Sequence, residues 1–171
     1  WLLERARPEL AAPTTRIADV HAYLAEKLTG AFASSGCAAD PLGLIDLRTG
    51  TWDDELCHAA RLDRGRLPRL VEVGTKAGVV LDDVADALGL PRGTALVAGA
   101  GDGQAAGLGA GALEPGTTYL NVGTAIVAGR AGGRPEIGRD FRTLVGPASG
   151  TWFMETDLLG GTFSLDWLAR T

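Results

Sequence analysis

The chain has 171 residues, of which 46% are hydrophobic and 22% charged, the composition of an ordinary globular protein with a core of its own. Its net charge of −5 argues against nucleic acid or an anionic membrane surface as a partner. No apolar run approaches the roughly 20 residues of a membrane span. Two cysteines are too few for a secreted disulfide scaffold, so we expect a cytoplasmic protein.

Helical patterns fill most of the first 94 residues. In TRIADVHAYLAEKLTG the apolar residues recur close to a 3.6-residue period, with Thr15 available to cap the helix and Gly30 to close it. Three further helices are expected in the segments WLLERARPEL, WDDELCHAARL and LDDVADALGL.

Strand and glycine-turn patterns follow from residue 94 onward. Residues 94–100 predict a buried strand that runs into a glycine turn, and GQAAGLGAGAL predicts a helix of small residues. Residues 117–122 and 125–128 predict two antiparallel strands joined at Gly123-Thr124. Beyond them, FRTLVGP and GTWFMET predict strands, and GTFSLDWLAR predicts a helix. The chain starts at Trp1 without a methionine, so we expect an internal piece of a longer protein.

Asp102 stands out because Glu114 is the only other charged residue between Gly93 and Gly129. It follows an apolar strand directly, and its neighbours are glycines, which let a ligand or another backbone segment come close. Open α/β sheets bind ligands at the carboxyl ends of their strands. The sequence therefore predicts a ligand site at Asp102.

Three interpretations of this glycine turn are open. Gly101, Gly103 and Ala106 match a dinucleotide fingerprint, but a carboxylate between the first two glycines would repel a pyrophosphate. Asp102 could instead only cap the helix that follows. The third interpretation is a phosphoryl-transfer site, because a second glycine turn, Gly123-Thr124, also follows a strand and offers backbone N–H groups and a hydroxyl to phosphate.

The segment VAGAGDGQAAGLGAGALEPGTTYLNVGTA resembles the central block of the FGGY carbohydrate kinases, which are ATP-dependent sugar kinases. The segments WLLERARPEL, HAYLAEKLTGAFASS, LIDLRTGTWDDEL and GTFSLDWL are also similar to FGGY motifs, so the likeness covers essentially the whole chain. Ser34-Ser35 stands where many members have Thr-Asp, and Ala125 replaces the usual serine or glycine. The details resemble xylulokinases most.

The resemblance implies an α/β fold of the actin-like, ribonuclease-H-like kind, built in two lobes. Residues 1–112 would be the C-terminal part of the first, sugar-binding lobe. Residues 113–171 would be the N-terminal part of the second, ATP-binding lobe. The 171 residues alone would be inactive, because much of the cleft lies outside them.

The implied activity is ATP-dependent phosphorylation of a sugar or polyol hydroxyl, with a ketopentose such as xylulose as the expected substrate. Asp102 would be the general base, and Gly103 and Gln104 would lie beside the sugar. Mg²⁺ would arrive with the nucleotide, without metal ligands from this chain. The ATP phosphates would meet Gly123, Thr124, Gly161 and Thr162.

A non-enzymatic alternative is a sugar-responsive regulator, or an inactive kinase relative, with the same fold. The presence of Asp102 favours an enzyme over this alternative. Asp157 and Asp166 are expected to be solvated, and nothing in the sequence indicates an oligomeric state.

Overall fold

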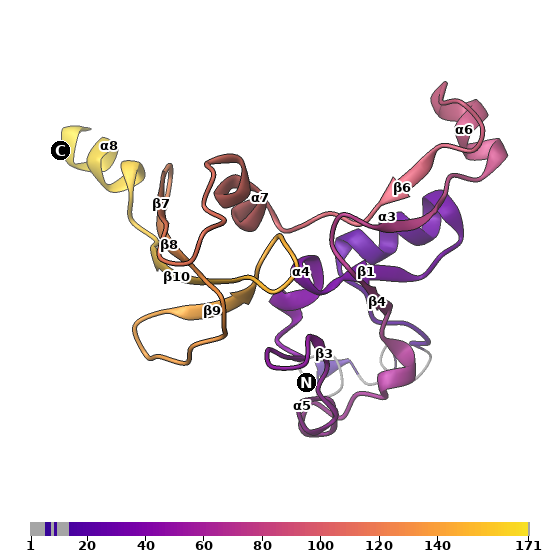
Figure 1. Cartoon of the computed structure of the whole chain (residues 1–171), viewed down its shortest axis with the longest axis horizontal. Helices are drawn as coiled ribbons and strands as arrows, with labels where there is room; N and C mark the ends of the chain where they lie inside the picture. Colours follow the sequence, from indigo (N-terminus) through magenta and orange to yellow (C-terminus); the bar gives the residue numbers. More distant parts are fainter. Residues whose placement is uncertain (1–5, 8, 10–13, 171) are drawn as a thin grey trace. The chain divides into compact units, whose positions relative to one another are not determined.

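The computed structural model describes residues 6–7, 9 and 14–170, and the chain divides into two compact units, Trp1–Gly99 and Ala100–Thr171 (Figure 1). The helix expected in WLLERARPEL falls largely outside the described residues. Among the described residues, no helix combines the length and the apolar character needed to cross a membrane.

The helices of the first unit begin and end at residues whose side chains or backbone explain the boundary. Helix α3 starts after Asp19, whose carboxylate accepts the N–H of Ala22 at 2.7 Å, so the predicted cap at Thr15 is wrong. It ends at Gly30, as predicted, with a φ of 73° that favours glycine. The helices are α3 (Val20–Thr29), α4 (Gly36–Ala39), α5 (Asp54–Ala59) and α6 (Asp82–Leu88), with 3-10 turns at Asp40–Leu42 and Arg64–Arg66.

The first unit also contains three two-stranded sheets, so the expectation of a mostly helical segment is wrong. Strands of two to four residues hold too few alternating positions to be recognised in the sequence. The pairs are β1 (Ala33–Ser35) with β4 (Arg69–Val71), β2 (Ile45–Asp46) with β3 (Thr51–Trp52), and β5 (Lys76–Val79) with β6 (Ala95–Val97).

Strand β6 confirms that a strand lies before the glycine turn, but it covers only Ala95–Val97, and the predicted burial is wrong because Ala95 and Val97 are exposed. It pairs antiparallel with β5, and the two strands form a sheet of their own. A dinucleotide fingerprint requires this strand to belong to a parallel βαβ unit, so the pairing argues against that interpretation.

The second unit is one helix followed by a four-stranded antiparallel sheet and a last helix (Figure 1). The predicted hairpin at 117–128 is confirmed, because β7 and β8 pair antiparallel from Thr118↔Arg130 to Val122↔Ile126. The elements are α7 (Asp102–Gly109), the sheet β7 (Thr118–Val122), β8 (Ile126–Gly132), β10 (Trp152–Leu158), β9 (Arg142–Val145) in spatial order, and α8 (Thr162–Arg170).

One face of this sheet forms the core of the second unit. Its buried cluster consists of Ala112, Tyr119, Ala131, Leu144 and Phe153. Helix α7 approaches this face through Gly107, where a Cβ atom would lie 2.5 Å from Cε2 of Phe153. The missing side chain therefore lets α7, the helix that begins with Asp102, lie directly on the Phe153 ring.

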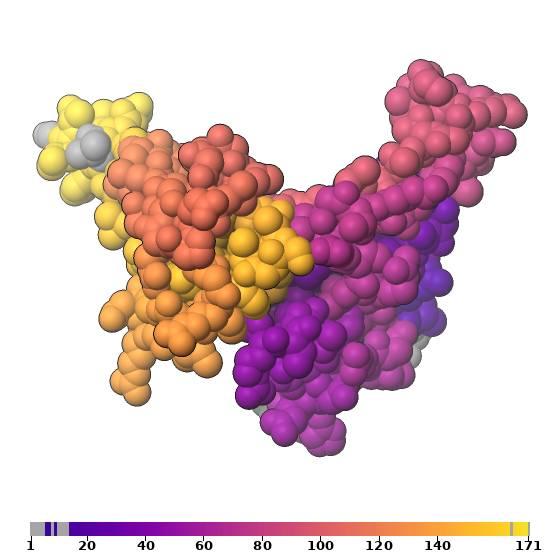
Figure 2. All heavy atoms as spheres, in the orientation of Figure 1, coloured from indigo at the N-terminus to yellow at the C-terminus, as the bar shows by residue number. Residues whose placement is uncertain are grey.

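Helix α8 stands out from the sheet at the end of the second unit (Figure 2). Its side chains Phe163, Trp167 and Leu168 are all more than half exposed. The predicted helix in GTFSLDWLAR is confirmed, and the helix begins at Thr162.

Candidate functional site

Asp102 is the first residue of α7, and Gly101 occupies the N-cap position. The Asp102 side chain is exposed, and its Oδ1 atom accepts one hydrogen bond, from the N–H of Gly103 at 2.8 Å. The carboxylate thus satisfies one N–H at the helix start and still faces solvent. A negative charge is favoured at this end of a helix.

Asp102 and Gly103 line a cavity of about 400 Å³ between α7 and the sheet. The remaining lining comes from Ala106 of α7, from all four strands, from Ala125 just beyond the Gly123-Thr124 turn, and from Leu159. The cavity is rich in polar groups, namely Asp102, Asn121, Arg142, Glu155 and Asp157. The carboxylates and the amide can bind hydroxyls, and the Arg142 guanidinium can bind phosphate.

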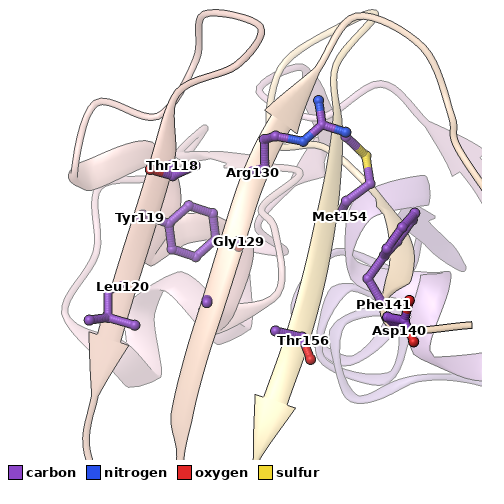
Figure 3. A pocket seen from close by; sticks show the side chains of 10 residues that line it. Thr118, Tyr119, Leu120, Gly129, Arg130, Asp140, Phe141, Met154 and Thr156 are labelled. Carbon is purple, nitrogen blue, oxygen red and sulfur yellow. The ribbon is translucent and has the colours of Figure 1, made fainter. Parts of the chain in front are cut away.

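A row of four residues crosses the sheet on the wall of this cavity. The register aligns Tyr119 with Gly129, Gly129 with Glu155, and Glu155 with Arg142. Figure 3 shows the Tyr119 ring reaching toward Gly129, which has no side chain to block it. The Tyr119 hydroxyl therefore passes over Gly129 and donates a hydrogen bond to Oε1 of Glu155.

Glu155 is the buried acid of the cavity, with 1% of its surface exposed. Besides Tyr119, it accepts a hydrogen bond at Oε2 from Nη2 of Arg142, at 3.0 Å. Burial and the hydrogen bond to Glu155 together raise the pKa of Tyr119 far above its usual value. Tyr119 thus stays a neutral donor, and Arg142 is the cation that balances the buried carboxylate.

Sequence reasoning did not identify Tyr119, Arg142 and Glu155 as site residues. The available signal was weak. Glu155 is an acid inside the mostly apolar segment GTWFMET, and as the neighbour of Met154 in a strand it would point to the opposite face of the sheet. Asp157 is exposed, as expected, but its Oδ2 atom also lies 3.6 Å from Nη2 of Arg142. Asp166 is exposed and pairs with Arg170 on α8 at 2.8 Å.

The four residues predicted to meet phosphate lie together at one edge of the second unit. The N–H of Gly161 donates to the carbonyl of Thr124, and the N–H of Thr162 to the carbonyl of Gly123, both at 3.0 Å. The Thr162 hydroxyl also donates to the Gly123 carbonyl, at 2.7 Å. The start of α8 therefore fixes the shape of the Gly123-Thr124 turn.

Close backbone approach explains the glycine at position 161. A Cβ atom there would lie 2.8 Å from the carbonyl oxygen of Gly123. The N–H and the hydroxyl of Thr162 both already donate to the Gly123 carbonyl, so contact of Thr162 with phosphate stays a prediction. The Thr124 hydroxyl is exposed and forms no hydrogen bond with any other described residue.

Gln104 is placed differently from Asp102 and Gly103. Its side chain is 4% exposed and folds back over the helix start, since a Cβ atom on Gly101 would lie 2.5 Å from Gln104 Oε1. Gln104 is absent from the lining of the Asp102 cavity. A direct contact between Gln104 and a sugar stays a prediction.

The opposite face of the sheet carries a second cavity, of about 530 Å³. It contains none of the predicted site residues, and its walls are mostly apolar. We therefore place the candidate site at the smaller cavity, where Asp102 lies. Figure 3 shows the side chains that line the larger one, among them Thr118, Leu120, Arg130, Phe141, Met154 and Thr156.

Comparison with known proteins identifies the family. Residues 1–109 match the N-terminal domain of the FGGY family of carbohydrate kinases. The chain belongs to the FGGY family. The family match ends at residue 109 and so includes α7, whereas the first compact unit of the structure ends earlier, at Gly99.

Curated relatives of this FGGY chain include two kinds of kinase. A xylulose kinase from Streptomyces rubiginosus is 36% identical over 124 residues, which cover 72% of this chain and 25% of that protein. An autoinducer-2 kinase from Escherichia coli is 35% identical over 124 residues, covering 72% of this chain and 23% of that protein. The FGGY chain thus spans about a quarter of the length of these relatives.

Solved structures agree on the fold. A xyloylose kinase from Brucella ovis superimposes with a TM-score of 0.92 at 25% identity, covering 98% of this chain and 35% of that one. A gluconate kinase from Lactobacillus acidophilus gives a TM-score of 0.91 at 21% identity, covering 96% of this chain and 34% of that one. The predicted actin-like, ribonuclease-H-like α/β fold is confirmed.

Proposed function

We propose that this chain is part of a kinase that transfers the γ-phosphoryl group of ATP to a hydroxyl of a sugar or polyol. The observation that carries the proposal is the cavity that Asp102 shares with Ala125, the residue next to the Gly123-Thr124 turn. A base for the acceptor and a turn suited to phosphate then lie at one cavity. The relatives named as xylulose kinases support a ketopentose such as xylulose as the substrate.

In the proposed reaction the sugar hydroxyl oxygen attacks the γ-phosphorus of ATP. A new oxygen–phosphorus bond forms, the bond to the β–γ bridging oxygen breaks, and ADP leaves with that electron pair. The hydroxyl proton passes to the Asp102 carboxylate, which faces solvent and can reach a ligand. Gly103, without a side chain, leaves room for the sugar beside the base.

We propose that the nucleotide phosphates meet the Gly123-Thr124 turn, which Gly161 and Thr162 hold in shape. We propose that a Mg²⁺ ion arrives with ATP, bound to its phosphates. When bound, that ion would neutralise negative charge on the phosphates. We also keep residues 1–112 and 113–171 as the proposed parts of the sugar-binding and ATP-binding lobes.

The test uses the full-length protein, meaning a longer protein that contains this chain. ADP release is measured with ATP and a panel of ketoses and polyols, and we expect release that depends on one or a few of these sugars. A protein that binds a sugar without releasing ADP would support the sugar-responsive regulator instead. Unchanged ADP release across the panel, with no sugar bound, would contradict both.

Replacing Thr124 with valine should weaken the use of ATP more than the use of sugar. The Thr124 hydroxyl is free to donate a hydrogen bond to phosphate, and a bond to a charged group contributes roughly 1.5–3 kcal/mol. We expect kcat/KM for ATP to fall by about 10- to 150-fold, from this range at 1.36 kcal/mol per decade. Thr118→Val is the control, because Thr118 is an exposed threonine on β7, the strand before the turn, and lines the other cavity. Unchanged ATP kinetics would remove Thr124 from the site.

A further inference from the structure

Among the described residues, Arg142 is the one cationic side chain that lines the Asp102 cavity. Three carboxylates share that lining with it: Asp102, Glu155 and Asp157. With all four groups ionised the lining has a formal charge of −2, which opposes the binding of phosphate. Any stabilisation of phosphate by side-chain charge within this cavity therefore has to come from Arg142.

The guanidinium of Arg142 is held in place but only partly used. Its Nη2 atom lies 3.0 Å from Glu155 and 3.6 Å from Asp157. Among the described residues, the Arg142 side chain forms no other ion pair or hydrogen bond, so the N–H groups of its Nη1 and Nε atoms remain available. The side chain is 58% exposed, which leaves those donors accessible to a ligand. An arginine already oriented by carboxylates loses little conformational freedom when it binds.

We propose, on the basis of the proposed function, that Arg142 is a second catalytic residue and contacts the γ-phosphoryl group during its transfer. Ala125 and Asp102 line the same cavity as Arg142, so a phosphoryl group passing from the Gly123-Thr124 turn to a hydroxyl at Asp102 would enter it. Charge on that group is spread over its equatorial oxygens, which a planar guanidinium can bind by two parallel hydrogen bonds. The bonds made and broken are those given above, and Arg142 exchanges no proton.

A purely structural role for Arg142 has to be separated from this one. Glu155 is buried, and removing its cationic partner leaves an uncompensated charge in the core. Loss of activity in Arg142→Gln could then follow from unfolding. The experiment needs a variant in which Glu155 no longer requires a cation.

The first comparison is between Arg142→Gln and Arg130→Gln in the full-length protein. Arg130 is a matched control, because it lies on β8 of the same sheet and pairs with Glu136 at 2.8 Å, but it lines the opposite cavity. We expect kcat to fall by about 10²-fold or more in Arg142→Gln, the loss seen when a donor to transition-state charge is removed. The KM for sugar should change little, and Arg130→Gln should stay within a few-fold of the parent.

The second comparison uses the double variant Arg142→Gln/Glu155→Gln, which leaves neither charge. The amide oxygen that Glu155→Gln introduces can still accept the hydrogen bond of Tyr119, so the core stays paired. A kcat that remains about 10²-fold low, with a melting temperature near that of the parent, supports the proposal. Recovery of kcat in the double variant shows that Arg142 only neutralises Glu155 and overturns it.

If Arg142→Gln keeps a nearly parental kcat, the inference about Arg142 is wrong. The proposed function then still stands, because the parent protein phosphorylates sugar. A parent that releases no ADP in response to any sugar overturns the proposed function and this inference together.

Discussion

Asp102→Asn should lower kcat of the full-length protein by about 10²–10⁴-fold, the usual contribution of a positioned acid or base. Asparagine keeps the size of the side chain and can still accept the Gly103 N–H that Asp102 Oδ1 accepts at 2.8 Å. Helix α7 therefore keeps its start, while the proposed acceptor for the proton of the attacking hydroxyl is removed. The KM for sugar should change much less, because an amide still bonds a hydroxyl.

Asp166→Asn is the matched control for this substitution. Asp166 is likewise an exposed aspartate on a helix of the second unit, and it pairs with Arg170 rather than lining the cavity. We expect its kcat to stay within a few-fold of the parent. If Asp102→Asn behaves in the same way as Asp166→Asn, then Asp102 only supports the start of α7 and is not the base.

The elements that were predicted correctly are those specified by neighbouring residues. Val122 and Ile126 flank a glycine turn between two apolar runs, and this local pattern is enough to predict the β7–β8 hairpin. Asp102 is recognisable because it is an isolated charge among glycines after a strand. In both cases the information lies within about ten residues, a distance over which turn chemistry and hydrophobic periodicity act.

The Tyr119–Glu155–Arg142 row could not be predicted in the same way. It depends on the register of strands 36 residues apart, and on Gly129 lying under the Tyr119 ring. A shift of one residue in either pairing would turn Glu155 away from α7. The cap of α3 failed for a simpler reason, because Asp19 offers a carboxylate closer to the apolar stretch than Thr15 does.

Phe153→Ala should destabilise the second unit by about 3–5 kcal/mol, the usual cost of removing a buried aromatic ring. Phe153 has no exposed surface, its ring centroid lies 5.1 Å from that of Tyr119, and Gly107 of α7 rests against it. Native-state hydrogen exchange of the β10 amides measures this loss of stability. The control is Phe163→Ala, which should change the free energy of unfolding by about 0.5 kcal/mol or less because Phe163 is 66% exposed. Because α7 positions Asp102, kcat of Phe153→Ala should fall as well. Equal protection of β10 in the two variants would show that this ring does not hold α7, the helix of the proposed base Asp102, on the sheet.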